Sequence, residues 1–323
     1  MKKIKALICD KRTRSICCPV ADPVLQSLPK NSIPVPQSLP NNSRTCDPAN
    51  GSCLPELGSC GKAGREQRIV GGKDALPGEF PFTALLGRTR TRRVGSVSVP
   101  VKQFTCGGTL INLRYVVTAA HCHHRTLKRK QLSLVRLGEY EVTDRNQTDC
   151  SGPRKDFCLE FPQDFDIKPE DVILHPDYGR VRQDKITNTI NDIALIRLPR
   201  TASVNLAVRV VCLPIHPKVA AEQLNVPDIE EGLTSFYPTV VGWGHTQGDP
   251  FNQSFSGTKE RVATEIQQKL AVPVLSSEQC SAKLFDFIPR ADQICAGGEV
   301  GKDSCGVSFK ELDFDMHVMT ELF

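Results

Sequence analysis

The chain has 323 residues, 39% of them hydrophobic, which is enough apolar material to bury a sizeable core and argues against a chain that is disordered throughout. Its net charge of +5 is only a modest excess, so charge alone gives no reason to expect a nucleic-acid partner. No run of about 18 apolar residues occurs, so no membrane span is expected.

The cysteines point to the compartment. There are 14 of them, spread along the chain instead of falling into paired zinc spacings, and we interpret them as disulfides of a secreted protein. N-glycosylation sequons fit the same compartment and occur at Asn41, Asn50, Asn146 and Asn252. The residues before Cys9 form no apolar stretch of signal-peptide length, so we expect secretion with a signal peptide that is not present in this sequence.

The first 68 residues divide into two pieces. Residues 1–20 carry Cys9, Cys17 and Cys18 but are too few to form a core, so this piece would depend on its disulfides. Residues 21–50 are rich in Pro, Ser and Asn with no apolar period, which predicts a linker. Cysteines 46, 53 and 60 follow, and a Cys46–Cys53 pair is no more than a guess by elimination.

Two basic runs follow in the next part of the chain. Such runs are most often solvated loops, and the alternative is a patch that binds a polyanion. The runs consist of Arg88, Arg90, Arg92 and Arg93, and of Arg125, Lys128, Arg129 and Lys130.

Short apolar runs separated by polar loops recur from residue 69 onward and predict an all-β chain. The expected strands include residues 131–137, 192–198, 239–242 and 268–274. Two further short strands, joined by a turn, are expected between Cys106 and Val117.

His121 lies just beyond the second of these strands, next to Cys122. An imidazole with its ordinary pKa of about 6.5 can take up and return a proton near neutral pH, which suits a general base. A single histidine at a strand end is more often an ordinary structural residue. The prediction of a base therefore rests on the motifs that accompany His121.

Five motifs occur in a fixed order along the chain. They are Arg-Ile-Val-Gly-Gly from Arg68, Val-Thr-Ala-Ala-His-Cys ending at Cys122, Asn-Asp-Ile-Ala-Leu from Asn191, Val-Gly-Trp-Gly from Val241, and Gly-Lys-Asp-Ser-Cys from Gly301. In this order and at these intervals, residues 69–305 resemble the trypsin-like, chymotrypsin-fold serine proteases. A narrower resemblance, to the clip-domain proteases of arthropods, rests on Cys9, Cys17, Cys18 and Pro19.

The resemblance implies a fold of two six-stranded antiparallel barrels that follow a partial clip segment and a linker. We expect a clip remnant at 1–20, a linker ending at the activation site at 21–68, a protease domain at 69–305 and a divergent tail at 306–323. The second barrel is expected to be incomplete, because the sequence ends before the last two strands and the C-terminal helix of the family.

The resemblance also assigns catalytic and specificity roles. His121 would be the general base and Asp192 the buried acid that orients its imidazole. Cleavage between Arg68 and Ile69 would activate a zymogen, because the new ammonium group of Ile69 would turn inward and order the oxyanion hole. Asp303 would lie at the base of the specificity pocket and select arginine or lysine.

Disulfides and a metal ligand follow from the same resemblance. Glu139 matches a ligand of the calcium loop of some relatives, with Glu141, Asp144 and Asp149 nearby, although exposed acids in a loop are usually only solvated. No cofactor is required for the chemistry, and calcium is the one metal considered. The implied pairs are Cys60–Cys212, Cys106–Cys122 and Cys280–Cys295. Cys150 and Cys158 lie in an insertion at residues 141–166 and are close enough in the sequence to bridge each other.

The family pattern breaks after Cys305, where Gly-Asp-Ser-Gly-Gly-Pro is expected. Residues 306–311 instead read Gly-Val-Ser-Phe-Lys-Glu. Counted strictly, Phe309 takes the place of the nucleophile. A one-residue deletion brings Ser308 there but removes the aspartate and both following glycines. Since Ile69 then has no internal carboxylate to meet, we expect this chain to be inactive.

Two functions compete. The first is a secreted trypsin-like endopeptidase zymogen of a proteolytic cascade, with protein substrates, an upstream activating protease and a serpin-type inhibitor as partners, and with neither nucleic acid nor membrane. The alternative is a non-catalytic homologue that acts as a regulatory binding protein. A metal-binding protein using His121, Cys122, His123 and His124 is the weakest hypothesis, because Cys122 has a disulfide partner in Cys106.

Overall fold

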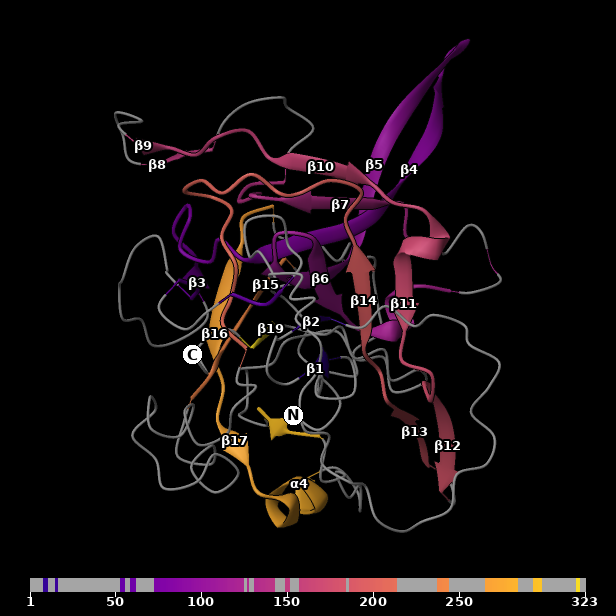
Figure 1. Cartoon of the computed structure of the whole chain (residues 1–323), viewed down its shortest axis with the longest axis vertical. Coiled ribbons are helices and arrows are strands. Elements are labelled where there is room, and N and C mark those ends of the chain that lie inside the picture. The colour runs from indigo at the N-terminus through magenta and orange to yellow at the C-terminus, as the bar shows by residue number, and fades with distance from the viewer. Residues whose placement is uncertain are drawn as a thin grey trace, which may run out of the picture.

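The computed structural model describes a large part of the chain, and most of that part is β-strand (Figure 1). Its one α-helix within the described residues is α4 (Ser277–Lys283). The predicted all-β class is therefore confirmed. The described residues are 8–10, 15–16, 53–55, 59–61, 73–124, 127, 131–142, 149–151, 157–183, 186–213, 237–243, 265–283, 293–297 and 318–319.

A curled seven-stranded antiparallel sheet dominates the structure (Figure 1). Its strands join neighbours that are mostly close in the sequence, as expected for a chain built from hairpins. In spatial order they are β10 (Gln163–Asp166), β7 (Leu134–Leu137), β4 (Thr83–Val94), β5 (Val97–Asn112), β6 (Tyr115–Thr118), β14 (Ala194–Arg197) and β11 (Val172–Leu174).

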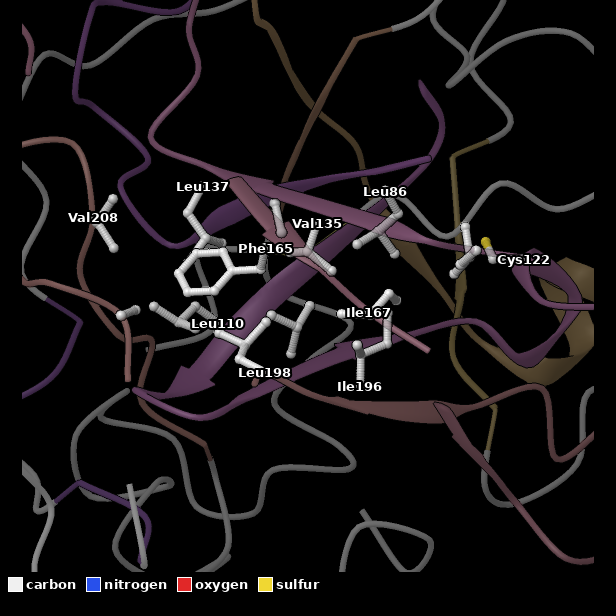
Figure 2. Close-up of a cluster of buried hydrophobic side chains, with 14 of the residues drawn as sticks. Leu86, Leu110, Cys122, Val135, Leu137, Phe165, Ile167, Ile196, Leu198 and Val208 are labelled. Carbon is white, nitrogen blue, oxygen red and sulfur yellow. The ribbon is translucent and has the colours of Figure 1, made fainter. Parts of the chain in front are cut away.

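The inner face of this sheet encloses the main hydrophobic core (Figure 2). Alternate residues of β4 turn inward, so Ala84 and Leu86 are buried while the register of the sheet brings Val135 opposite Leu86. Gly108 allows β5 to pack closely, because a Cβ there would lie 2.8 Å from Val116 Cγ1 and 2.9 Å from the Val117 carbonyl oxygen.

A smaller four-stranded sheet combines three strands from the second half of the chain with β3 from the first half. Its order is β19 (Val318–Met319), β15 (Thr239–Gly242), β16 (Gln268–Ala271) and β3 (Lys73–Asp74). A separate two-stranded sheet pairs β17 (Val274–Leu275) with β18 (Cys295–Ala296), and α4 lies between these two strands in the sequence.

The two halves are joined around Tyr140. Its carbonyl oxygen accepts hydrogen bonds from Trp243 Nε1 and from the backbone N–H of Gln267, each at 2.9 Å. A second hydrophobic cluster also joins the halves, since it packs Val241 of β15 with Leu195 of β14 and Phe82. These contacts fix the positions of the two sheets relative to each other.

Three hairpins and two short helices complete the described elements. In addition, β4 and β5 together extend well beyond the sheet as a long ribbon (Figure 1). No helix of the described part is long and apolar enough to cross a membrane. The remaining elements are β1 (Ile8–Asp10) with β2 (Ser15–Ile16), β8 (Cys150–Ser151) with β9 (Phe157–Cys158), β12 (Gly179–Gln183) with β13 (Ile186–Ile190), and the 3-10 helices η2 (Ala120–Cys122) and η4 (Pro169–Asp171).

Candidate active site

Strand register brings His121 and Asp192 to the same end of the sheet. Strands β6 and β14 are antiparallel, and Thr118 at the end of β6 pairs with Ala194 at the start of β14. His121 follows Thr118 closely, in η2, and Asp192 shortly precedes Ala194. Because antiparallel strands reverse direction, a residue just after one and a residue just before the other emerge together.

Asp192 holds His121 with both of its carboxylate oxygens. His121 Nδ1 lies 2.8 Å from Asp192 Oδ2, and the backbone N–H of His121 donates to Asp192 Oδ1 at 2.9 Å. The side chains are 16% and 22% exposed, respectively, so both are partly shielded from water. An ionised carboxylate on Nδ1 favours the tautomer with its proton on Nδ1, which leaves Nε2 as the basic atom.

The ionisation of Asp192 follows from the same contacts. Burial alone would raise the pKa of its carboxyl group. The side-chain hydrogen bond and charge of His121, with the backbone N–H groups of His121 and Ala120, outweigh that burial, and the pKa is lowered from its ordinary value. Asp192 is therefore a carboxylate at neutral pH, as an acid that stabilises an imidazolium must be.

The loop before Asp192 is fixed by its neighbour Asn191. The backbone of Asn191 has a φ of +56°, a left-handed conformation that asparagine adopts more readily than most residues. Its side-chain Nδ2 donates to the Asp177 carbonyl oxygen at 2.7 Å, and Ile193 N–H donates to the Asn191 carbonyl oxygen at 2.8 Å. Sequence analysis included Asn191 in a motif but gave it no structural role, although an asparagine directly before a buried acid is a signal for this turn.

A disulfide fixes the other side of the pair. Cys106 of β5 and Cys122 of η2 are joined with an S–S distance of 2.02 Å, directly beside His121. The two sulfurs and the imidazole lie within 4.8 Å of one another, a spacing that a metal could bridge. Both sulfurs are in the disulfide, so they supply no thiolate, and these residues do not fit a metal site.

The other predicted cysteine pairs also lie together. Cys60 and Cys212 are bonded with an S–S distance of 2.01 Å, so the segment before Arg68 is covalently attached to the body. Leu54 and the Cys53 carbonyl oxygen add contacts there, since Leu54 is buried in the second cluster and the oxygen accepts from Asn112 Nδ2. Disulfides also join Cys150 with Cys158 and Cys280 with Cys295.

Glu139 lies in a network of charges instead of an open cation site. Its Oε2 accepts from Arg136 Nη1 at 2.8 Å, and its Oε1 accepts from Tyr140 N–H at 3.2 Å. Arg136 also donates to Asp164 through Nε at 2.7 Å and Nη2 at 2.9 Å, while Asp149 Oδ2 accepts from Tyr140 N–H at 3.1 Å. We call Arg136, Glu139, Asp149 and Asp164 the Arg136 network.

Calcium does not fit the described part of this network. Both oxygens of Glu139 already accept hydrogen bonds, and the positive charge beside them is the guanidinium of Arg136. Burial, followed by the charge of Asp149, raises the pKa of Glu139 to about 7 in spite of Arg136, and a half-protonated acid is a poor calcium ligand. The Arg136 network is one that sequence analysis missed.

The remaining predicted site residues are not part of the described structure. Arg68 and Ile69, the expected activation bond, and Asp303, the expected specificity residue, lie outside the described residues, as do Ser308 and Phe309. The structure therefore brings together the predicted base and its acid, and it describes neither the nucleophile segment nor the specificity pocket.

Comparisons with known proteins show which family the sequence matches. The Trypsin family model matches residues 69–306. The chain is 39% identical over 259 residues to phenoloxidase-activating factor 1 of Holotrichia diomphalia, covering 78% of this chain and 60% of that protein. It is 33% identical to CLIP domain-containing serine protease B10 of Anopheles gambiae, covering 94% of this chain and 69% of that one.

A solved structure supports the fold. The Drosophila Grass clip serine protease of the Toll pathway aligns with a TM-score of 0.51 and 24% identity, covering 75% of this chain and 57% of that one. At this identity the likeness concerns the fold alone, and it agrees with the two-barrel trypsin-like architecture. This chain spans about 60% of the length of the first of these relatives.

Proposed function

Because the chain belongs to the trypsin family, we propose that it represents a secreted serine endopeptidase zymogen of a proteolytic cascade, in which His121 is the general base and Asp192 orients it. The observation that carries this proposal is the two-point contact of Asp192 with His121, through Nδ1 at 2.8 Å and the backbone N–H at 2.9 Å. That contact leaves Nε2 as the basic atom for a hydroxyl group.

The chemistry of the pair is a proton transfer. Nε2 of His121 takes the proton of a serine hydroxyl while its oxygen attacks the peptide carbonyl carbon, and the same proton then passes to the leaving amine. Asp192 stays ionised and stabilises the imidazolium that forms in between. No cofactor takes part in this family's hydrolysis, and calcium has no place in the proposal because Arg136 already pairs with Glu139.

This chain lacks the family pattern that supplies the hydroxyl. After Cys305 it reads Gly-Val-Ser-Phe-Lys-Glu, so either Phe309 replaces the nucleophile or Ser308 stands there without its flanking aspartate and glycines. We therefore propose that this polypeptide keeps the base and the acid but performs no turnover itself.

The zymogen part of the proposal rests on how the N-terminal piece is attached. The Cys60–Cys212 disulfide and the buried Leu54 hold that piece on the body, so cleavage of the Arg68–Ile69 bond would leave two connected chains. An arginine at that bond calls for an upstream protease of trypsin-like specificity, and Asp303 would give the enzyme the same preference for arginine or lysine.

Partners and boundaries follow from the same proposal. The names of a phenoloxidase-activating factor and a Spaetzle-processing enzyme describe action on another protein, which supports protein substrates and a cascade here. A serpin-type inhibitor is the third proposed partner, beside the protein substrates and the upstream protease.

The location and the domain boundaries belong to the same proposal. The disulfides support an extracellular location. We keep the division into clip remnant 1–20, linker 21–68, protease domain 69–305 and tail 306–323.

The test starts from the messenger RNA. We expect the sequence downstream of the Cys305 codon to yield a form that encodes Gly-Asp-Ser-Gly-Gly-Pro. Cleaved after Arg68, that form should hydrolyse an arginyl ester, and its His121→Ala variant should lose about 10⁴-fold or more. The 323-residue chain itself should show no turnover that a serine-directed inhibitor blocks. Inhibitor-sensitive turnover by this chain would contradict its proposed inactivity.

A second function is favoured by one observation, the sequence after Cys305. If no other form of the message exists, the chain is a non-catalytic homologue that binds a cascade protease or its substrate. Such a protein should be secreted and folded, and it should bind one of those partners in a pull-down without hydrolysing the arginyl ester.

A further inference from the structure

The ribbon formed by β4 and β5 extends beyond the body of the protein (Figure 1). It begins at a β-bulge between Leu86 and Gly87 and continues in regular register from the pair Arg88 and Gln103 to the pair Val94 and Val97 at the tip. A Cβ on Gly87 would lie 2.1 Å from the Gln103 carbonyl oxygen, so the close approach at this base requires glycine.

The two faces of the ribbon differ in chemistry. Alternate strand residues point to the same side and lie about 6.8 Å apart. One face, which we call the arginine face, consists of Arg88, Arg90, Arg92, Val99, Val101 and Gln103. The opposite face consists of Thr89, Thr91, Arg93, Ser98, Pro100 and Lys102.

Contacts with the body show how the faces are turned. Lys102 Nζ pairs with Asp164 of β10, and the Arg136 guanidinium stacks over the Phe104 ring at 5.2 Å, so the opposite face is held against the outer side of the sheet. The arginine face continues the inner side of β4, on which Leu86 is buried. Cys106, paired with Leu86, connects that side directly to Cys122 beside His121.

The arginine face is a cationic row over an apolar base. No aspartate or glutamate occurs between Arg88 and Gln103 in the sequence. Partial burial, followed by the neighbouring charge of Arg90, lowers the pKa of the Arg88 guanidinium, so these like charges act on each other. Val99 and Val101 are half-buried between them, and at the tip Val94 and Val97 are 58% and 60% exposed.

We propose that the arginine face is a docking surface for an extended acidic segment of a protein partner. A peptide in a strand-like conformation repeats every second side chain at about the spacing of Arg88, Arg90 and Arg92, so its carboxylates can meet successive guanidinium groups. The valines favour a polypeptide over a sulfated glycan, because only a polypeptide brings apolar side chains to cover them. A partner bound here would lie on the side of the sheet that leads to His121.

The test measures binding of a labelled peptide to the full chain by fluorescence anisotropy, without any turnover. The probe alternates glutamate with valine, and a lysine–valine peptide of equal length is its control. We expect Arg90→Ser and Arg92→Ser each to weaken binding by about three- to fivefold, with the loss shrinking at high salt. Arg93→Ser removes the same charge from the opposite face and should change binding less than twofold. This binding measurement does not depend on a catalytic serine. Its result therefore tests the docking surface independently of the proposed function.

Other results would overturn the proposal. If Arg93→Ser weakens binding of the peptide as much as Arg92→Ser does, the ribbon attracts acidic peptides by its overall charge and the arginine face has no special role. If a heparin oligosaccharide or phosphatidylserine vesicles bind through Arg90 and Arg92 more tightly than the peptide does, the occupant is a glycan or a membrane instead. Arg90→Lys keeps the charge and should retain most of the binding, which separates charge loss from a folding defect. Loss of binding in Arg90→Lys with an unchanged melting temperature would contradict recognition by charge.

Discussion

Asp192 and Glu139 differ in ionisation although each accepts a hydrogen bond at 2.8 Å from a basic side chain. The pKa of Asp192 is lowered, because three hydrogen bonds and the charge of His121 outweigh its partial burial. The pKa of Glu139 is raised to about 7, because deeper burial and the charge of Asp149 outweigh Arg136. Asp192 therefore stays ionised at the strand ends, whereas Glu139 in the Arg136 network has a carboxyl group that is only partly ionised near neutral pH.

The largest effect should come from removing Arg136. The Arg136→Met variant leaves Glu139 and Asp164 without their shared cation, and breaking such a partly buried pair typically costs about 3 to 5 kcal/mol. We expect a loss of that order in the free energy of unfolding, measured with urea at pH 8.

Arg197 provides the matched control for this prediction. It pairs with Asp171 at 3.0 Å, but its side chain is 43% exposed compared with 15% for Arg136. Arg197→Met should cost about 1 kcal/mol or less. Equal losses in the two variants would mean that burial does not distinguish the Arg136 network.

The next largest effect should be a pH dependence that arises from Glu139. Its folded-state pKa of about 7 exceeds the ordinary glutamate value of about 4.3, so the folded protein binds this proton more tightly. That stabilisation is complete below about pH 4.3 and is lost as the pH rises through about 7. Between pH 5 and pH 8, approximately, we expect the wild type to lose on the order of 2 kcal/mol relative to Glu139→Gln in urea unfolding.

The exposed Glu170 serves as the comparison for that titration. Glu170→Gln should follow the wild type at every pH, since this variant leaves the Arg136 network intact. If Glu139→Gln also runs parallel to the wild type across this range, Glu139 titrates as an ordinary surface acid.

These two regions also show what sequence can predict. The motifs that contain His121 and Asp192 predicted that these two side chains lie together, and the structure shows their contact. The Arg136 network depends on the register that sets Arg136 opposite Asp164, residues far apart in the sequence, and no local pattern encodes that pairing. Sequence analysis therefore matched Glu139 with calcium. It did not recognise Arg136 as the partner of Glu139, although Arg136 is only three residues away in the sequence.

The ribbon shows a similar limit. Its arginines were recognised as a basic run, for which a solvated loop or a polyanion patch was expected. Arginine alternates with threonine from Arg88 to Arg92, and valine alternates with serine from Val97 to Val99, which is the two-residue period of a strand. The high charge of the segment led to its interpretation as a loop instead. Only the hairpin register separates Arg93 from Arg88, Arg90 and Arg92 and so distinguishes the two faces.

A smaller loss is expected at Asp192. Asp192→Ala leaves the N–H groups of His121 and Ala120 without their acceptor, which should cost about 1 to 2 kcal/mol in the free energy of unfolding. Because the folded-state pKa of Asp192 is lowered, its stabilisation is present above the unfolded value of about 3.9 and disappears as the pH falls through the folded value. The gap between wild type and variant should therefore close in acid.

Asp177 is the control for this variant, because it is exposed and contributes backbone groups to the same loop. Asp177→Asn should leave the unfolding free energy within about 0.5 kcal/mol of the wild type at all pH values. A gap for Asp192→Ala that persists in strong acid would show that its cost is steric and not the loss of a charged acceptor.

The smallest effect should be that of calcium. An ion bound at about 100 times its dissociation constant adds about 2.7 kcal/mol of stability, which would raise the melting temperature by several degrees. Because the guanidinium of Arg136 and the N–H of Tyr140 already occupy both oxygens of Glu139, we expect millimolar calcium and a chelator to give the same melting temperature within about 1 °C. A saturable rise with calcium but not with magnesium would show that a cation enters in spite of Arg136. Glu139 would then be a ligand after all, and its distinction from Asp192 would come from a metal ion instead of an arginine.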